Sequence, residues 1–318
     1  MEKNQNKKTG LLRSFIGEAT PAKASGVTYT LTAILSVVVA FTFLIGIAVL
    51  GFMKDGYETS DWYLYCSYLL TPLTFLLVAL YVMRWTRSSI SKEFRRQICP
   101  ARYFLIAVLL QCGLLSLSQL NSLFLEWLGN FGYQDVPINI PSLDGFGFIG
   151  VLFTVAVLPA VFEEIIFRGL LLNGMRCFGM VGAVLLNGAL FALYHQNPAQ
   201  TIYQFCCGAA FALIALRAGS ILPTIFSHFL NNALIITLMK LNSSDLTGTA
   251  MTVVLIVSAV CLVGALFWLI FFDKGRNDGT AEIKKNDGKT EKKYFFQYAA
   301  IGVALYALTW ISVLLKGV

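Results

Sequence analysis

Apolar runs long enough to cross a lipid bilayer recur along almost the whole of this 318-residue chain. A transmembrane helix needs about 20 mostly apolar residues to cross the hydrocarbon core. Because 57% of the residues are hydrophobic and only 13% are charged, the chain has too little polar surface to cover a soluble domain of this size. The sequence therefore predicts an all-α protein, a polytopic transmembrane helical bundle of about eight to nine spans. The nine predicted spans cover residues 27–53, 62–83, 103–128, 146–172, 178–195, 200–217, 219–240, 248–272 and 295–315.

Lysine and arginine residues are concentrated in alternate connections between these spans. The amino-terminal tail holds five of them, the connection after the second span six, and the connection after the eighth span seven. The opposite connections carry acids such as Asp55, Asp61 and Asp144. By the positive-inside rule, this distribution predicts a multi-pass protein with its amino terminus cytoplasmic and its carboxyl terminus outside. The length, the lack of an organelle address and the lysine-rich loops predict a bacterial cell membrane. The net charge of +7 follows from this topology, so we predict a lipid bilayer and no nucleic acid as a partner.

A few ionisable side chains lie inside the apolar segments. They are the only two histidines of the chain, His195 and His228, and an acidic pair, Glu163 and Glu164, with Arg168 one turn further on. An ionisable side chain in a membrane span costs on the order of 2.5–3.5 kcal/mol on insertion scales, so a chain that keeps several of them is expected to use them. These residues are therefore the candidates for chemistry.

The segment PAVFEEIIFRGLLL places the two glutamates differently around one helix. Glu164 and Arg168 are four residues apart and can pair on one face. Glu163 points about 100° away from Glu164. One carboxylate can thus be neutralised while the other faces a cavity. The alternative is that all three residues form a structural charge cluster between helices.

The second histidine-bearing pattern lies in LNGALFALYHQ. Asn187, Phe191 and His195 recur every four residues and define one stripe of a helix. Such a histidine can hold a water molecule or relay a proton. Alternatively, it is a structural residue at a helix end.

The segment SILPTIFSHFLNN provides two further polar side chains on one face. His228 and Asn232 are four residues apart, so an imidazole and a carboxamide project from adjacent turns. Two donors in this arrangement can stabilise an oxyanion. The alternative is a polar contact between helices. The neighbouring Asn231 is predicted to point away from this face.

Taken together, these side chains suit the attack of an activated water molecule on a peptide carbonyl. Glu163 would accept the proton, His195 would hold the water, and His228 with Asn232 would stabilise the oxyanion. No serine or cysteine nucleophile with a matched base is evident, so a covalent route has less support.

Three motifs in the same order resemble those of a known family. FEEIIFRG, FALYH and HFLNN fit the patterns E-E-x-x-x-R, F-x-x-x-H and H-x-x-x-N of the CPBP family, also called the Abi family, which contains the type II CAAX prenyl proteases and relatives linked to bacteriocin processing and self-immunity. The resemblance covers about residues 145–240 and implies an intramembrane endopeptidase acting on a peptide or membrane-protein substrate. It implies that Glu163 is the base, that His195 holds the water and that His228 and Asn232 form the oxyanion site. Glu164, Arg168 and Phe191 take supporting positions.

Other functions and a metal-dependent mechanism remain as alternatives. Glu163, His195 and His228 form a common type of zinc ligand set, so a divalent metal such as zinc is the alternative to a site without a cofactor. The H-E-x-x-H arrangement is absent, and the seven cysteines show no zinc-binding spacing. The alternative functions are a proton-coupled transporter and a non-enzymatic bacteriocin immunity or membrane partner protein.

The predicted depths of the candidate residues conflict with one another. At 1.5 Å per residue, Glu163 and His228 lie roughly 12–15 Å from the cytoplasmic boundary, whereas His195 lies about 26 Å from it if its helix begins at residue 178. Either residues 174–182 lie along the interface and the helix begins later, or these boundaries are wrong, and we favour the first. The predicted organisation is a cytoplasmic tail (1–26), N-terminal transmembrane helices (27–144), a catalytic helical core (145–240), an eighth helix (241–273), a basic, flexible cytoplasmic linker (274–294) and a C-terminal helix (295–318).

Overall fold

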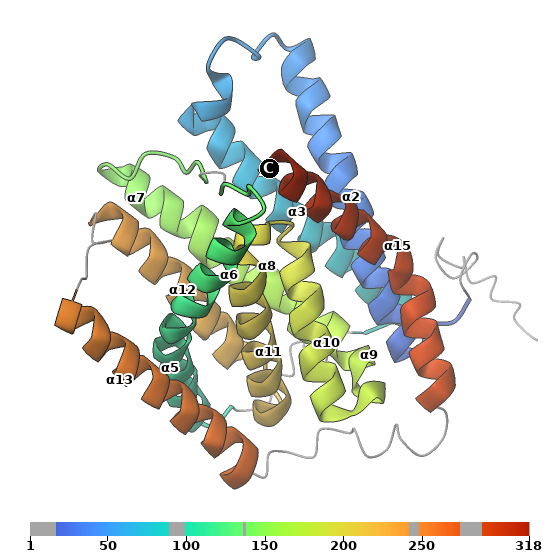
Figure 1. Cartoon of the computed structure of the whole chain (residues 1–318). Helices are drawn as coiled ribbons and strands as arrows, with labels where there is room; N and C mark the ends of the chain where they lie inside the picture. Colours follow the sequence, from blue (N-terminus) through green and yellow to red (C-terminus); the bar gives the residue numbers. More distant parts are fainter. Residues whose placement is uncertain (1–16, 89–98, 136–137, 242–247, 274–287, 318) are drawn as a thin grey trace, which may run out of the picture.

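The structure, a computed structural model, is a bundle of helices (Figure 1). It describes residues 17–88, 99–135, 138–241, 248–273 and 288–317, and these residues contain no strand. Eight of the described stretches are long and apolar enough to cross a membrane. The predicted polytopic all-α fold is therefore confirmed, and the chain is a multi-pass membrane protein.

The helices are named here in chain order. The first half contributes α2 (Pro21–Val49), α3 (Asp61–Thr86), α5 (Arg102–Leu114), α6 (Ser118–Gly129) and α7 (Phe146–Val151). The second half contributes α8 (Leu158–Glu164), α9 (Leu172–Met175), α10 (Gly179–Tyr194), α11 (Thr201–Ala218), α12 (Leu222–Lys240), α13 (Gly248–Phe267) and α15 (Gly288–Lys316). Wider π-helical turns form η3 (Leu152–Val157), η4 (Ile165–Leu171) and η7 (Trp268–Phe272). Short 3-10 turns form η1 (Tyr57–Thr59), η2 (Leu115–Leu117), η5 (Arg176–Phe178) and η6 (Pro198–Gln200).

The longest apolar stretch, Phe146–Tyr194, contains two of the predicted spans. As one straight helix its 49 residues would be about 73 Å long, more than twice the ~30 Å of the hydrocarbon core. The chain instead turns back at η5, and Gly179 directly after it has a φ of 76°, in the left-handed region that favours glycine. In Figure 1, α9 and α10 lie on the two sides of this turn.

Two predicted helix boundaries were wrong at their amino-terminal ends. The first helix begins at Pro21 rather than at residue 27, because Thr20 accepts a hydrogen bond from the Lys23 amide and proline suits the first turn. The last helix begins at Gly288 rather than at residue 295, so residues 288–294 of the predicted linker are helical. The rest of that linker, and residues 1–16 of the predicted tail, lie outside the described residues.

The predicted late start of the fifth span was also wrong. The helix α10 begins at Gly179, directly after η5, and not later. The physical reason is that the preceding helix extends beyond residue 172 to Met175, which places Glu163 deeper than predicted, about 18 Å from Met175. His195 lies about 24 Å from Gly179 by the same measure. The two residues are therefore only about 6 Å apart in depth.

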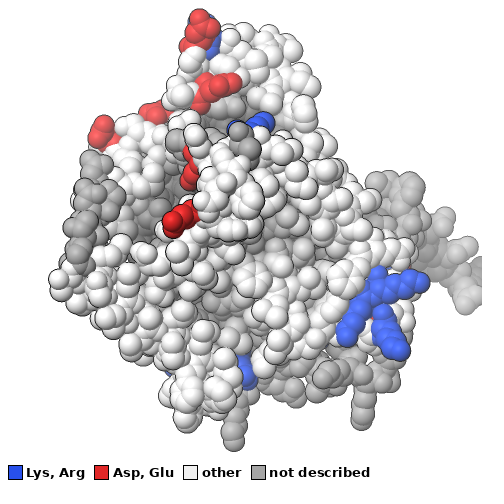
Figure 2. Space-filling model, in the orientation of Figure 1, with Lys and Arg blue, Asp and Glu red and all other residues white. Residues whose placement is uncertain are grey.

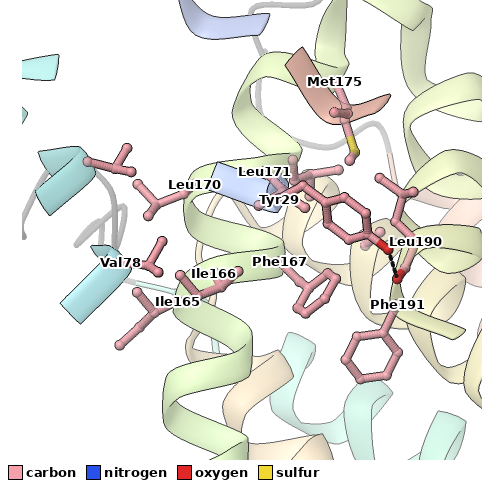
Figure 3. Close-up of a cluster of buried hydrophobic side chains, with 14 of the residues drawn as sticks. Tyr29, Val78, Ile165, Ile166, Phe167, Leu170, Leu171, Met175, Leu190 and Phe191 are labelled. Carbon is pink, nitrogen blue, oxygen red and sulfur yellow. Dashed lines mark hydrogen bonds between the residues drawn. The ribbon is translucent and has the colours of Figure 1, made fainter. Parts of the chain in front are cut away.

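The main hydrophobic core surrounds η4 and α10. Figure 3 shows Ile165, Ile166 and Phe167 of η4 among side chains from the neighbouring helices. The hydroxyl of Tyr29, on α2, donates to the Leu190 carbonyl of α10 over 3.0 Å. Because Tyr29 is fully buried, this bond satisfies a hydroxyl that would otherwise be costly to bury.

Glycines allow two pairs of helices to approach closely. A Cβ on Gly208 would lie 2.9 Å from the Gly188 Cα, where α11 crosses α10. A Cβ on Gly302 would lie 2.8 Å from the Thr30 Cα, where α15 crosses α2. Small residues at such crossings are typical of membrane helices, because backbones pack there without side chains between them.

The outer surface suits a hydrocarbon environment. On α13, Val260 and Val263 are each 66% exposed, and much of α2 and α15 is similarly apolar. Figure 2 shows acidic residues gathered at one end of the bundle, where the α2–α3 connection exposes Asp55 and Glu58. This end is the one predicted to face outside, and the orientation in the membrane stays a prediction.

Candidate active site

The three sequence motifs meet where α8 and η4 pack against α10 and α12. Glu163 and Glu164 are the last two residues of α8, and His195 directly follows α10. His228 lies in the second turn of α12, a helix that begins with Pro223 in its first turn. The fold thus brings together residues that are far apart in the sequence.

Glu164 is fully buried, and its charge is compensated at one of its two carboxylate oxygens. Its Oε1 accepts a hydrogen bond from Arg168 Nη1 over 2.7 Å and lies 3.0 Å from His228 Nδ1. A carboxylate oxygen can only accept, so His228 donates through Nδ1. The predicted pairing of Glu164 with Arg168 is therefore confirmed, and His228 joins the same pair.

Arg168 is held by contacts with α10 and α11 as well as by Glu164, whereas its Nε has no hydrogen-bond partner. Its Nη2 donates to the Gly208 carbonyl over 3.1 Å, which the close crossing of α10 and α11 brings within reach. The guanidinium lies 4.3 Å from the centre of the Phe191 ring, a favourable cation–π distance. A guanidinium with these contacts is a fixed structural partner for Glu164.

Glu163 has a different environment. Its Oε1 accepts a hydrogen bond from the Tyr194 hydroxyl over 3.0 Å. Its Oε2 has no hydrogen-bond partner and lies 3.9 Å from His228 Nε2, beyond hydrogen-bonding distance. Glu163 is 6% exposed, whereas Glu164 is 0% exposed. Of the two carboxylates, Glu163 is the one without a hydrogen-bonded cation.

Phe191 is the side chain that the two histidines share. Its ring centre lies 4.6 Å from that of His195 and 6.0 Å from that of His228, both edge-to-face. The predicted stripe also holds for Asn187, whose amide donates to the Phe167 carbonyl of η4 over 2.9 Å. This stripe fixes α10 against η4, and with it the place of His195.

The tautomer of His195 follows from its backbone contact. Its Nδ1 lies 2.8 Å from the Phe191 carbonyl oxygen, which can only accept, so Nδ1 carries the proton. In the neutral ring, Nε2 then has a free lone pair. That nitrogen can accept a hydrogen bond from a water molecule.

A comparison with protein families identifies the central part of the chain. Residues 145–234 match the family model described as Type II CAAX prenyl endopeptidase Rce1-like. This part of the chain is similar to the Rce1-like family. The match contains all three motifs and ends six residues before the predicted limit of 240. Comparisons with curated proteins and with solved structures gave no match.

Within the Rce1-like segment, the Asn232 amide is partly committed. Its Nδ2 donates to the Val155 carbonyl of η3 over 3.0 Å, and its Oδ1 accepts from Asn231 Nδ2 over 3.1 Å. Nδ2 carries two protons, so a second N–H is left for another acceptor. The predicted joint role of His228 and Asn232 as oxyanion donors stays a prediction.

Asn231 belongs to a buried polar network that the sequence analysis missed. Its Oδ1 accepts from Gln111 Nε2 over 2.7 Å and from the Tyr203 hydroxyl over 2.6 Å. The side chain thus faces α5 and α11, while its Nδ2 fixes Asn232. Gln111 is the one amide side chain in the apolar sequence of α5, and this isolated polar residue could have indicated a buried polar contact.

A metal site needs three or more ligating side chains close together. Among the described residues, no three histidine, cysteine, aspartate or glutamate side chains lie close enough together to hold a metal ion. His228 directs Nδ1 to Glu164, and His195 directs Nδ1 to a backbone carbonyl. Both contacts leave Nε2 free, as in histidines that bind a metal, so Glu163, His195 and His228 as zinc ligands stay an alternative.

The contact of Tyr194 with Glu163 was also not predicted from the sequence. Tyr194 lies inside the FALYH motif, but only the fold shows that its hydroxyl reaches Glu163. We expect Tyr194→Phe to reduce cleavage of a peptide substrate by about ten- to a hundredfold, the usual value of a hydrogen bond to a charged group. The midpoint of thermal unfolding should fall only as far as the loss of one buried hydrogen bond requires, because the ring keeps its contact with Phe167.

The matched control is Tyr29→Phe. That hydroxyl donates to the Leu190 carbonyl, away from the glutamates. We expect this variant to lower the unfolding midpoint and to keep the kcat of the native protein. Equal losses of activity in the two variants would show that the Tyr194 hydroxyl has no particular effect on Glu163.

Proposed function

We propose that the protein is an intramembrane endopeptidase that hydrolyses a peptide bond with a water molecule activated by Glu163. The observation that carries this proposal is the contrast between the two glutamates. Oε1 of Glu164 is bound by Arg168 and His228, whereas Glu163 has no hydrogen-bonded cation and places an unpartnered Oε2 beside His228 Nε2. Oε2 of Glu164 is also unpartnered, but that residue is fully buried, whereas Glu163 is 6% exposed. The gap of 3.9 Å between Glu163 Oε2 and His228 Nε2 suits a bridging water better than a direct hydrogen bond.

In the proposed first step, Glu163 accepts a proton from this water as its oxygen attacks the scissile carbonyl carbon. His195 Nε2 accepts a hydrogen bond from the same water and orients it. A new C–O bond forms, and the carbonyl oxygen becomes an oxyanion. In the second step the C–N bond breaks, and the proton held by Glu163 passes to the leaving nitrogen. No atom or electron is left over, and Glu163 returns to its carboxylate form.

The oxyanion requires donors, and the proposal assigns this role to His228 and to the second N–H of Asn232. His228 already donates through Nδ1 to Glu164, so a donation through Nε2 requires the imidazolium form. With His228 in that form, two carboxylates are balanced by the imidazolium and by Arg168. A buried cluster with zero net charge is less costly than one with an unpaired charge.

The Rce1-like match also guides the proposed substrate and setting. We propose a peptide or membrane-protein substrate, a CAAX-like carboxyl terminus among the candidates, reached from the cytoplasm or the bilayer of a bacterial cell membrane. We propose no cofactor. The glutamate mechanism needs none, and a divalent metal such as zinc is the alternative.

The test uses the full-length protein reconstituted in lipid vesicles. It is incubated with a farnesylated CAAX peptide and with the same peptide without the prenyl group, and the products are identified by mass spectrometry. We expect new fragments from at least one peptide, and none with Glu163→Gln or His195→Ala. Cleavage that persists in either variant would remove the proposed mechanism.

Two further arms separate the alternatives. Cleavage that stops with 1,10-phenanthroline and returns with Zn²⁺ would support the metal-dependent route. Absence of cleavage, together with bacteriocin protection that survives Glu163→Gln, would support a non-enzymatic immunity protein. Absence of cleavage with substrate flux driven by a proton gradient would support a transporter.

A further inference from the structure

A cavity of about 280 Å³ lies between α2, α3 and α15, mostly outside the Rce1-like segment. Each helix contributes one face to its wall. The polar part of the lining consists of hydroxyl and amide side chains, among them Ser36, Ser67, Thr71, Tyr306, Thr309 and Gln196. In Figure 1, α15 runs alongside α2, and α3 follows α2 through the connection at the top of the view.

Several hydroxyls in this cavity make no hydrogen bond to the described part of the protein. Serine and threonine in helices often bond back to the carbonyl of the preceding turn. Thr74 does so with Leu70 over 2.8 Å, and Thr309 with Leu305 over 3.2 Å. Ser67 and Thr71 are four residues apart on the same face of α3 and make no hydrogen bond among the described residues. Both keep a donor and an acceptor for a ligand.

The inner end of the cavity adjoins the candidate active site. Tyr306 lines the cavity, and its ring packs edge-to-face on Tyr194 at 5.9 Å. The Tyr194 hydroxyl in turn donates to Glu163. Gln196, the residue after His195, also lines the cavity. A ligand in this cavity would therefore end beside the proposed catalytic residues.

The seam between α2 and α15 is closed next to the cavity. Gly302 lies directly on α2, where its amide donates to Thr30 Oγ1 over 3.1 Å. Thr30 Oγ1 donates to the Tyr298 carbonyl over 2.6 Å. On the other side, Val37 lines the cavity and is 40% exposed on the apolar outer surface. We therefore place the entrance of the cavity on the lipid side, beside Val37, and not between α2 and α15.

We propose that this cavity binds the extended backbone of the substrate next to the bond that is cut, after the substrate has entered sideways from the bilayer. The proposal rests on the proposed function. A peptide must be unwound to be cleaved, and its unpaired N–H and C=O groups are costly in a lipid environment. Ser67, Thr71 and Gln196 supply partners for them. The volume is close to the lower end of ligand pockets, about 300 Å³, and suits a short segment.

The first experiment measures the contribution of the hydroxyls. The double variant Ser67→Ala/Thr71→Val removes both with little change in shape. We expect KM for the cleaved peptide in vesicles to rise about tenfold, the effect of two neutral hydrogen bonds, with kcat nearly unchanged. The matched control is Thr42→Val on α2, whose hydroxyl already bonds to the Val38 carbonyl. An unchanged KM in the double variant would overturn the proposal.

The second experiment does not depend on catalysis. p-Benzoyl-phenylalanine is placed at Val37 or, as a control, at the lipid-facing Val260 of α13, both in the Glu163→Gln background. The vesicles contain the two peptides of the cleavage assay or an apolar Leu/Ala peptide of about 20 residues. We expect light-dependent cross-links to peptide from position 37 and not from position 260. Cross-linking to lipid alone at position 37, or equal labelling at both positions, would overturn the proposal.

The outcomes keep the two proposals apart. Cross-links at position 37 without any proteolysis by the native protein would retain the binding cavity and remove the endopeptidase. Proteolysis with no cross-link at position 37 would retain the endopeptidase and remove the cavity as its substrate site.

Discussion

Glu163→Gln is expected to lower kcat/KM for peptide cleavage by about 10²–10⁴-fold, the usual contribution of a general base. Glutamine has nearly the same shape, and its Oε1 can still accept the hydrogen bond that Tyr194 donates. An amide does not take up the proton of the water, however, so the chemical step slows. The measurement is the rate of fragment formation by mass spectrometry, with thermal unfolding in detergent to show that the bundle remains folded.

The informative control is the neighbouring variant Glu164→Gln. Glu164 receives hydrogen bonds from Arg168 and His228, and the residue is fully buried. We expect this variant to lower the unfolding midpoint, because it leaves the guanidinium without its carboxylate. Glu163→Gln should leave the midpoint nearly unchanged. A folded, inactive Glu164→Gln protein beside an active Glu163→Gln protein would reverse the assignment of the two glutamates.

The sequence was sufficient for the relations between residues on one helix. The spacing of four between Glu164 and Arg168 predicted their pairing, which is observed. The 100° offset predicted that the other carboxylate could face a cavity. Glu163 bonds to Tyr194 instead and does not line the described cavity. The stripe that leads to His195 was likewise predicted, and Asn187 and Phe191 pack as a helical period of about four requires.

The positions of residues on different helices relative to one another could not be predicted from the sequence. The depths of Glu163 and His195 were in conflict because a span boundary was placed at residue 172, whereas the helix continues to Met175. The π-helical turns of η3 and η4 also change the rise per residue next to the glutamates, and hydropathy does not reveal them. The contacts of Tyr194 with Glu163 and of Gln111 with Asn231 depend on how separate helices pack.

Arg168→Met is expected to be the most destabilising single change in this site. Arg168 and Glu164 are 0% exposed in their side chains and are joined over 2.7 Å. Removing one partner of a buried ion pair leaves the other charge uncompensated and typically costs about 3–5 kcal/mol. The Gly208 carbonyl and the Phe191 ring also lose their contacts with the guanidinium. The measurement is the free energy of unfolding in detergent.

Two comparisons identify the cause of this loss. The double variant Glu164→Gln/Arg168→Met removes both charges, so its destabilisation should be smaller than the sum of the two single effects, as expected for residues in contact.

Arg102→Met breaks the ion pair between Arg102 Nη2 and Asp273 Oδ1, which are 3.5 Å apart, and the arginine side chain is 56% exposed. The Asp273 side chain is only 4% exposed, but it keeps the hydrogen bond that the Tyr103 hydroxyl donates over 2.7 Å, so this variant should be destabilised less than Arg168→Met. Equal destabilisation by Arg168→Met and Arg102→Met would contradict the view that the buried charge of Glu164 needs Arg168. The expected inactivity of Glu163→Gln is explained by a neutralised Glu164 beside a free Glu163. The same result would therefore remove that explanation as well.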